Sequence, residues 1–295
     1  MDLKLTNLTR EFDGFRAVDQ ISYRFGCGVY GLLGVNGAGK TTLMRMLTTL
    51  MQPSSGAITW DGEDIFAMQG RYRRLLGYLP QDYGCYPDFS VYDYLMYIAA
   101  LKGLQPAAAK QRANALLEQV GLAKARSKKM KTLSGGMKRR AGIAQAMLND
   151  PKILILDEPT AGLDPNERIR FRNLISELSK DRIVLLSTHI VSDVEYIANE
   201  LLLMKDGTIA ISGDTAEVIA SMAEGVWKCT VPRNQADAFI RRHRVSNVKN
   251  LPDGAELRII SANPPTQDAV AEIPTLEDAF LYYLGERGTE QDGSL

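Results

Sequence analysis

The feature that most constrains this chain is an eight-residue loop sequence. Residues 34–41, Gly-Val-Asn-Gly-Ala-Gly-Lys-Thr, fit the pattern G-x-x-x-x-G-K-[ST] without a mismatch and follow the strand-like run 29–33. Between a strand and a helix, this pattern predicts a glycine-rich turn whose backbone N–H groups surround phosphate at the positive end of the helix dipole. A plain glycine turn is the alternative, which the complete match disfavours. The chain is therefore predicted to bind a nucleoside triphosphate.

The loop residues predict how the nucleotide is held. Lys40 is expected to reach the β- and γ-phosphates, and the Thr41 hydroxyl is expected to bind Mg²⁺. The remaining loop contacts are predicted from Gly34, Asn36, Gly37, Ala38, Gly39 and Thr42. The loop alone does not choose among ATPases, GTPases and kinases.

Composition and charge narrow the class of protein. With 295 residues, 45% hydrophobic and 24% charged, the chain is long enough for one large domain and a smaller one. Lys+Arg and Asp+Glu both number 35, so no overall basic field marks a nucleic-acid partner, and none is expected. No run approaches the roughly 20 apolar residues that span a bilayer, and the first residues carry no signal pattern. We therefore expect any role at a membrane to come through a partner.

The hydrophobic pattern predicts an α/β core with two additions. Short apolar runs at 153–156 and 183–186, each near a helical segment, are typical of parallel strands buried on both faces. Apolar residues at three-and-four spacing between residues 92 and 120 predict a helical insertion. Strand-like patterns that predict a β-rich lobe around the nucleotide lie at residues 2–8, 18–25 and 57–60.

The pattern of apolar and polar residues changes after residue 214. Strand-like runs at 226–231 and 255–261, with a helical run at 235–242 between them, predict a small α+β domain. The chain is accordingly divided into a nucleotide-binding domain, residues 1–222, and a small accessory domain, residues 223–295.

Two carboxylates follow the predicted strand 153–156. Asp157 is expected to hold Mg²⁺, through a water molecule, and Glu158 to orient or deprotonate the water that attacks the phosphate. An Asp-Glu pair by itself is usually only a solvated strand end. Downstream of a phosphate-binding loop, the same pair predicts hydrolytic chemistry.

A five-residue segment upstream of that strand identifies a family. Residues 133–137, Leu-Ser-Gly-Gly-Met, closely resemble the L-S-G-G-Q signature of ATP-binding cassette (ABC) proteins, and the resemblance extends over residues 2–213. It implies a P-loop ABC ATPase domain, with a parallel-sheet core, an antiparallel β lobe and a helical insertion, that uses ATP and Mg²⁺. Met137 replaces the usual glutamine, a variation associated with the export branch of the family.

The resemblance also implies a homodimer of nucleotide-binding domains. Ser134, Gly135 and Gly136 are then expected to grip the γ-phosphate of ATP bound on the second copy. Asp164 ends the segment Ala-Gly-Leu-Asp, which matches the D-loop that crosses the dimer interface in this family. Taken alone, the segment that contains Ser134 would indicate an ordinary helix-capping loop, and the segment that ends at Asp164 would indicate a turn.

Three more positions match motifs that surround ATP in this family. Gln81 matches the Q-loop, whose amide contacts Mg²⁺ or the attacking water, and His189 matches the switch histidine that contacts the γ-phosphate and the catalytic glutamate. Phe12 fits the aromatic residue that stacks on adenine, with Phe15 close by; a phenylalanine of the core is the alternative. The implied catalytic residues are Lys40, Gln81, Glu158 and His189.

The tail resembles the terminal helix of ABC ATPases that drive drug, lantibiotic or polysaccharide exporters. This resemblance rests on residues 274–281 and implies an exporter subunit at the cytoplasmic face of the cell membrane, held there by a polytopic membrane permease. A soluble ABC ATPase acting on ribosomes or DNA, and the ATPase of an importer, are the alternatives. A GTPase is disfavoured because the sequence has no Asn-Lys-x-Asp guanine-reading segment.

Aromatic residues are abundant in the predicted helical insertion. Tyr92, Tyr94 and Tyr97 lie close together along the chain, just after the loop 83–89, which carries further aromatic residues. One interpretation is that all of them pack inside the insertion. Our hypothesis is that some of them, with Gln81, form a groove for a short cytosolic helix of the membrane subunit.

Overall fold

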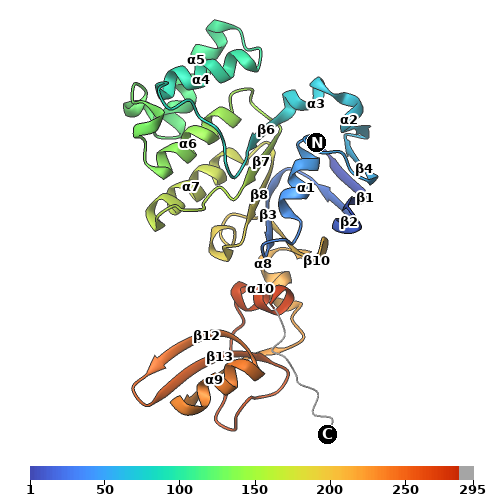
Figure 1. Ribbon diagram of the computed structural model, residues 1–295, viewed down its shortest axis with the longest axis vertical. Coiled ribbons are helices and arrows are strands. Elements are labelled where there is room, and N and C mark those ends of the chain that lie inside the picture. Colours follow the sequence, from blue (N-terminus) through green and yellow to red (C-terminus); the bar gives the residue numbers. More distant parts are fainter. Residues whose placement is uncertain (286–295) are drawn as a thin grey trace.

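The computed structural model describes residues 1–285, which form two parts stacked along the long axis of the molecule. Figure 1 shows the larger part, with strands and helices in layers, above a small sheet. We call the elements from β1 to α8 the large domain and those from β11 to β14 the small domain. Among the helices of residues 1–285, none combines the length and apolarity that a bilayer crossing requires.

The core of the large domain is a six-stranded sheet in the order β10-β9-β3-β8-β7-β6. Four neighbouring pairs are parallel, and β10 alone runs antiparallel to its neighbour β9. The strand bounds are β3 (Gly28–Gly34), β6 (Leu76–Leu79), β7 (Ile153–Asp157), β8 (Ile183–Thr188), β9 (Glu200–Lys205) and β10 (Thr208–Gly213). The predicted parallel-sheet core is therefore confirmed.

Helices bury both faces of this sheet. Along β3, Val29 and Leu33 join one apolar cluster with helices α6 (Gly135–Ala146) and α7 (Pro165–Leu178), whereas Leu32 joins a second cluster on the opposite face. That second cluster contains the apolar side chains of α1 (Lys40–Leu47). Burial on both faces explains why the strands are continuous apolar runs in the sequence.

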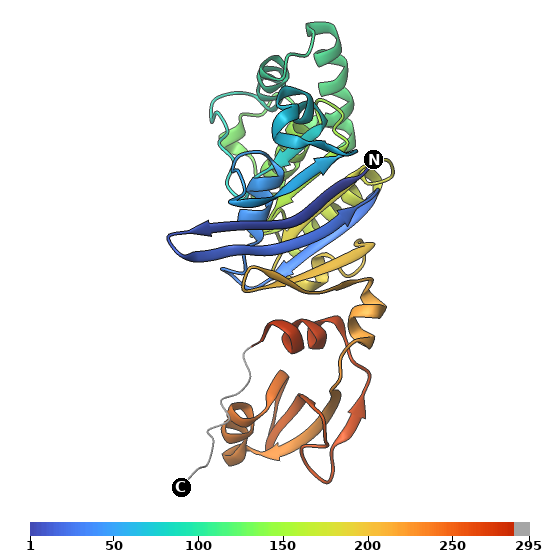
Figure 2. The same ribbon diagram turned by 90° about the vertical axis from the view of Figure 1, so that its right-hand side faces the viewer.

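The β lobe is an antiparallel sheet in the order β2-β1-β4-β5. Its first two strands are longer than predicted, because a tight turn at Asp13 and Gly14, both with positive φ, joins them into one long hairpin. Figure 2 shows this hairpin crossing the large domain. The bounds are β1 (Leu3–Phe12), β2 (Phe15–Phe25), β4 (Ser55–Trp60), β5 (Glu63–Asp64) and, after them, α2 (Ile65–Met68) and α3 (Gly70–Leu75).

The predicted helical insertion is confirmed, and it consists of two helices. Helix α4 (Val91–Leu101) and helix α5 (Pro106–Gln119) are separated at Gly103, whose φ of 76° ends the first helix, and Pro106 starts the second. Two 3₁₀ turns, η1 (Ala123–Ala125) and η2 (Met130–Thr132), lead from α5 to α6.

The small domain is a four-stranded antiparallel sheet, ordered β12-β13-β11-β14, with one helix on one face. The sequence did not predict β12, because its exposed central residues, 247–250, give no apolar alternation. The bounds are β11 (Gly225–Pro232), α9 (Arg233–Arg242), β12 (Arg244–Leu251), β13 (Gly254–Ser261) and β14 (Val270–Glu272).

The chain returns to the large domain after the small sheet. Helix α10 (Leu276–Leu284) follows the sheet, yet Leu276, Ala279 and Leu284 are buried in the large domain's apolar cluster, beside α8 (Thr215–Ala220). The predicted division at residue 223 stays a prediction, and residues 286–295 of that range lie outside the described residues. The structure adds that the small sheet lies between two segments packed on one core.

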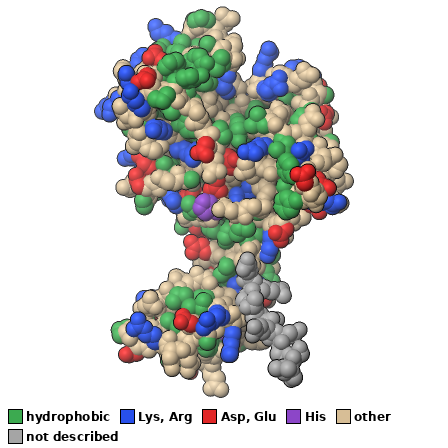
Figure 3. Space-filling view, in the orientation of Figure 1, with side chains coloured by type: hydrophobic (Ala, Val, Ile, Leu, Met, Phe, Trp, Pro, Cys, Tyr) green, Lys and Arg blue, Asp and Glu red, His purple; other side chains and the backbone are tan. Residues whose placement is uncertain are grey.

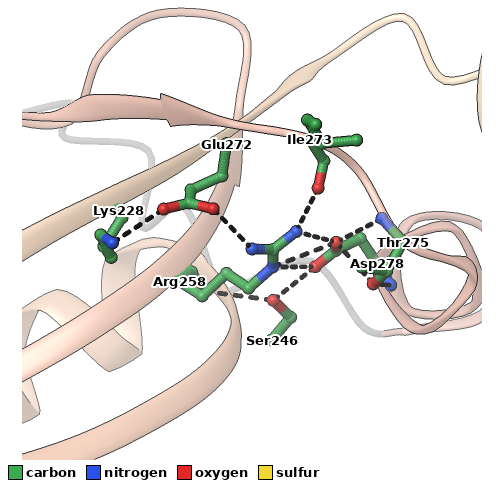
Figure 4. A network of polar contacts seen from close by, with 7 residues as sticks. All are labelled: Lys228, Ser246, Arg258, Glu272, Ile273, Thr275 and Asp278. Atoms are coloured by element: carbon green, nitrogen blue, oxygen red, sulfur yellow. Dashed lines mark hydrogen bonds and ion pairs between the residues drawn. The ribbon is translucent and has the colours of Figure 1, made fainter.

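A buried carboxylate joins the small sheet to α10, as Figure 4 shows. Asp278, 1% exposed, accepts hydrogen bonds from Ser246 Oγ at 2.6 Å, Arg258 Nη2 at 2.7 Å and the Thr275 backbone N–H at 2.8 Å. Burial opposes ionisation of this carboxyl group, but the hydrogen bonds outweigh it, so the pKa of Asp278 lies below its ordinary value. The charged form of Asp278 therefore contributes to joining the two parts.

Candidate active site

A cleft of about 430 Å³ lies over the carboxyl ends of the central strands, where ligands bind in open α/β sheets. It brings together many of the predicted site residues from five separate segments. Those on its wall are Phe12, Asn36, Gly37, Ala38, Gly39, Lys40, Thr41, Thr42, Gln81, Glu158 and His189. Figure 3 shows charged side chains of both signs over the front of the large domain, without a field of one sign.

Glycine is required where the loop enters helix α1. Gly39 caps this helix with a φ of 101°, and a Cβ atom placed there would lie 2.1 Å from the carbonyl oxygen of Ala17 on β2. No other residue fits that space in this conformation. The backbone N–H groups that begin α1 are thereby presented to the cleft, as anion binding requires.

Lys40 is held inside the loop that precedes it. Its side chain is buried, and Nζ donates to the carbonyl oxygens of Gly34 at 2.6 Å and Val35 at 3.2 Å. Burial lowers the pKa of Lys40, and the nearby carboxylates of Glu158 and Asp157 oppose this by favouring the charged form. Gly34 itself is not on the cleft wall and contributes through this carbonyl.

The two predicted carboxylates differ in where they point. Asp157 ends β7, is 1% exposed and accepts a hydrogen bond from Ser187 Oγ at 2.6 Å, so it lies beneath the cleft wall. Glu158 is the next residue and lines the cleft. Its backbone has a φ of 46°, an uncommon conformation for a residue other than glycine, and its N–H donates to the same Ser187 hydroxyl at 3.0 Å.

Glu158 contacts His189 across the end of the sheet. The Nδ1 atom of His189 lies 3.0 Å from Glu158 Oε2, and the imidazole side chain is 51% exposed toward the cleft side. Strands β7 and β8 are parallel neighbours, so residues that follow their ends meet. The contact pairs the Glu158 carboxylate with an imidazole nitrogen on the wall of the cleft.

Besides Gly34 and Asp157, four predicted site residues are not on this wall. Ser134 caps α6, accepting a hydrogen bond from the Met137 N–H at 3.2 Å, and Asp164 caps α7, accepting from the Glu167 N–H at 2.9 Å. Gly136 leaves no room for a side chain, because a Cβ atom there would lie 2.5 Å from Glu167 Oε2; Gly135 precedes it. Within one copy, Ser134 therefore has the helix-capping role that was the alternative for its segment, and Asp164 caps a helix where the alternative was a turn.

Both phenylalanines near the adenine position are at the surface. Phe12 is 36% and Phe15 is 63% exposed, and both line the cleft. The Arg10 guanidinium lies 4.5 Å from the centre of the Phe12 ring and holds that ring in place. The alternative of a core phenylalanine is therefore wrong, and stacking on adenine by either ring stays a prediction.

The oxygen donors near the cleft fit Mg²⁺. Thr41 offers a hydroxyl and Gln81 an amide on the wall, with the Asp157 carboxylate behind them. Within residues 1–285, no group of three or more His, Cys, Asp or Glu residues could hold a metal ion by itself. A site with one carboxylate suits a magnesium ion that is also held by nucleotide phosphates.

Sequence reasoning missed two residues that position this site. Ser187 joins Asp157 and Glu158 through one hydroxyl, and Arg139 on α6 donates to the backbone carbonyls of Gln81 and Glu158. A hydroxyl two residues before the predicted histidine was an available signal for Ser187. Arg139 gave no signal, because its partners are 58 and 19 positions away along the chain.

Comparisons with known proteins agree with this geometry. Residues 18–161 match the family model described as ABC transporter. The chain is 38% identical to the Nod factor export ATP-binding protein I of Cupriavidus metallidurans, over 74% of this chain and 73% of that protein. It is 32% identical to the probable multidrug ABC transporter ATP-binding protein YbhF of Escherichia coli, over 98% of this chain but about half, 53%, of that protein. Among solved structures, cbiO1 of Clostridium perfringens, part of the ABC transporter complex cbiONQ, matches with a TM-score of 0.69 and 31% identity, over 74% of this chain and 90% of that one.

Proposed function

Since the chain belongs to the family of ABC transporter ATP-binding proteins, which bind and hydrolyse ATP to power transport, we propose that it drives an exporter through ATP-dependent closure of a homodimer. The observation that carries the hydrolytic part is the Glu158–His189 contact at 3.0 Å on the wall of the cleft that also holds Lys40. A glycine-rich anion site and a base paired with histidine, in one cleft, suit hydrolysis of a terminal phosphate.

The residues divide the reaction among them. Lys40 and the N–H groups at the start of α1 bind the phosphates, and Glu158 orients or deprotonates the attacking water. His189 holds the Glu158 carboxylate and would contact the terminal phosphate. Thr41, Gln81 and Asp157 would hold Mg²⁺, which neutralises charge on the phosphates when bound.

The residues outside the cleft support a dimer. Ser134, Gly136 and Asp164 are not on their own chain's cleft wall, although they match motifs that contact ATP. Ser134 and Gly136 lie at the start of α6, where N–H groups face outward. A second copy would bring this helix start to the phosphates, so closure of the dimer completes each site.

Export is favoured over import by three features. The tail helix α10 corresponds to the predicted exporter-like segment, Met137 stands where glutamine is usual, and a relative that is 38% identical is named for Nod factor export. The transported compound is recognised by another chain. In this proposal the subunit lies at the cytoplasmic face of the membrane, bound to a polytopic permease.

An aromatic cluster beside the Q-loop supports attachment to that permease. Tyr86 and Tyr97 are 47% and 36% exposed and pack around Phe89, with ring centres 4.9 to 5.7 Å apart. Tyr94, in contrast, is buried. Exposed aromatic rings next to a nucleotide-contacting loop suit a short helix of the membrane subunit, since such anchors dominate binding at interfaces.

Purification from detergent-solubilised membranes tests the proposal. The tagged full chain is expected to bring down a polytopic membrane protein rather than ribosomes or nucleic acid. Vesicles that contain the purified complex should then move cargo away from the ATP-binding side only when ATP is hydrolysed. Recovery with nucleic acid, or movement toward the ATP-binding side, would contradict attachment to a permease or export, respectively.

A further inference from the structure

The guanidinium group of Arg139 donates hydrogen bonds to backbone carbonyls in two different segments of the candidate active site. Nη1 donates to the Gln81 carbonyl at 2.8 Å and lies 3.4 Å from that of Pro80, and Nη2 donates to the Glu158 carbonyl at 3.2 Å. Its neighbour Arg140 contacts other segments: it donates to the backbone carbonyls of Val120 and Gly121 and pairs with the Glu167 carboxylate at 3.3 Å. Arg139 therefore connects the loop of Gln81 with the residue predicted to be the general base.

Glu158 is a residue whose backbone has to be held. Its φ of 46° lies in the left-handed region, which residues other than glycine rarely adopt and which the surrounding contacts have to maintain. Ser187 Oγ accepts from the Glu158 N–H on one side of the Cα atom, and Arg139 donates to the Glu158 carbonyl on the other. Because both flanking peptide groups are held, the direction in which the Glu158 side chain leaves the backbone is fixed, and the carboxylate then contacts His189 at 3.0 Å.

The loop of Gln81 is attached to the same helix at a second point. The Tyr83 hydroxyl donates to the carbonyl oxygen of Lys138 on α6. The Tyr83 ring fits against α6 because residue 142 is glycine, where a Cβ atom would lie 2.9 Å from the ring. Helix α6 begins at the segment capped by Ser134, so Arg139 connects the partner-facing end of α6 to both groups that handle the attacking water.

We propose that Arg139 is a positioning residue that holds Glu158 and Gln81 at a fixed separation and ties both to helix α6. This inference rests on the proposed role of Glu158. The planar fork of arginine donates to two acceptors in fixed directions, which the single ammonium group of lysine cannot reproduce. Misplacement of a catalytic group by about 1 Å costs up to about 10²-fold in rate.

The test compares Arg139→Met with a matched control in the full chain. Methionine keeps the helix propensity and the apolar stem but removes the donors. The turnover number for MgATP is expected to fall by about 10²-fold, with KM and nucleotide affinity within about twofold of wild type. The control is Arg112→Met, which removes another arginine that donates to a backbone carbonyl, Met147 O at 3.1 Å, away from the cleft; it should keep wild-type turnover.

Arg139→Lys and a double variant make the test specific. Arg139→Lys should have a turnover between those of Arg139→Met and wild type. If Arg139→Met does not fold, the same comparison with wild type is made with Arg139→Lys. In a Glu158→Gln background, Arg139→Met should cause a much smaller further loss than it causes alone, because one of the two groups that it positions is already inactive. A full additional loss in the double variant, or a change confined to KM, would overturn the inference.

The outcome also separates this inference from the proposed function. If Glu158→Gln is slow while Arg139→Met and Arg139→Lys turn over at the wild-type rate, Arg139 has no positioning role and the proposed chemistry stands. If Glu158→Gln itself turns over at the wild-type rate, the role of Glu158 fails and the inference falls with it.

Discussion

Two buried carboxylates, Glu158 and Asp278, are surrounded in opposite ways. Glu158 faces a cleft, has an uncommon backbone conformation and contacts His189 through one carboxylate oxygen. Asp278 accepts hydrogen bonds on both oxygens, from Ser246, Arg258 and Thr275, and is 1% exposed. In our proposal, a carboxylate whose acceptor sites stay open takes part in the reaction, whereas one whose acceptor sites are filled contributes to the structure.

The two sites also differ in what completes them. The Asp278 network is formed within one chain, from β12, β13 and the start of α10. The cleft around Glu158 lacks Ser134 and Asp164 on its own wall, so our proposal completes it with a second copy. Loss of Glu158 should therefore affect turnover, and loss of Asp278 should affect the free energy of unfolding.

Replacing Glu158, whose acceptor sites stay open, is expected to have the largest effect, on the rate of ATP hydrolysis. Glu158→Gln should keep ATP binding but lower steady-state turnover by about 10²- to 10⁴-fold, the usual contribution of a positioned base. An ATP-stabilised dimer should accumulate, which size-exclusion chromatography with ATP would detect. If this variant has near-normal ATPase activity with the membrane partner present, Glu158 does not act as the base, and the proposed difference between Glu158 and Asp278 is wrong.

Mixing two inactive subunits tests whether the cleft is shared. Ser134→Arg and Lys40→Ala should each inactivate the homodimer, because every site then carries a lesion. If Ser134 acts on the partner's ATP, a mixed dimer carries both lesions in one site and keeps the other intact. Partial ATPase activity is therefore expected in the mixture, and its absence in verified mixed dimers would contradict the shared arrangement.

Replacing Asp278, whose acceptor sites are filled, should lower the free energy of unfolding. Asp278→Ala leaves the Arg258 guanidinium without its buried partner and is expected to lower the free energy of unfolding by about 3–5 kcal/mol in urea denaturation. Turnover per folded molecule should stay within about twofold of wild type. Lys228→Ala is the control, since its pair with Glu272 at 2.8 Å is at the surface and should contribute at most about 1 kcal/mol.

Three aromatic residues, of which Tyr86 is exposed and Phe89 and Tyr92 are half-buried, should give a smaller effect, on binding of the membrane subunit. Tyr86→Ala, Phe89→Ala and Tyr92→Ala are each expected to weaken association with the membrane subunit by about 1–2 kcal/mol and to abolish transport, with nucleotide affinity unchanged. Quantitative pull-down against the purified permease measures this. Normal assembly and transport in all three variants would mean that the permease binds another surface.

Local sequence patterns predicted the residues of the cleft better than they predicted the long-range contacts that hold those residues in place. The loop around Lys40 and the pair at Asp157 are recognisable because their chemistry depends on neighbouring residues at fixed spacing. The contacts of Arg139 and Asp278 join segments 19 to 58 positions apart, so no short pattern encodes them. Strand β12 was missed for a related reason, since polar residues are tolerated on an open face and at an edge.

The return of α10 to the large domain makes the small sheet an insertion rather than an appendage. Leu276, Ala279 and Leu284 fill the same apolar cluster as Val218 of α8, before the sheet. A chain cut after residue 222 would leave a hole in that core and expose apolar surface to solvent. Anyone who wishes to isolate the ATPase, or to exchange the small sheet between relatives, should excise the sheet and rejoin the chain ahead of α10.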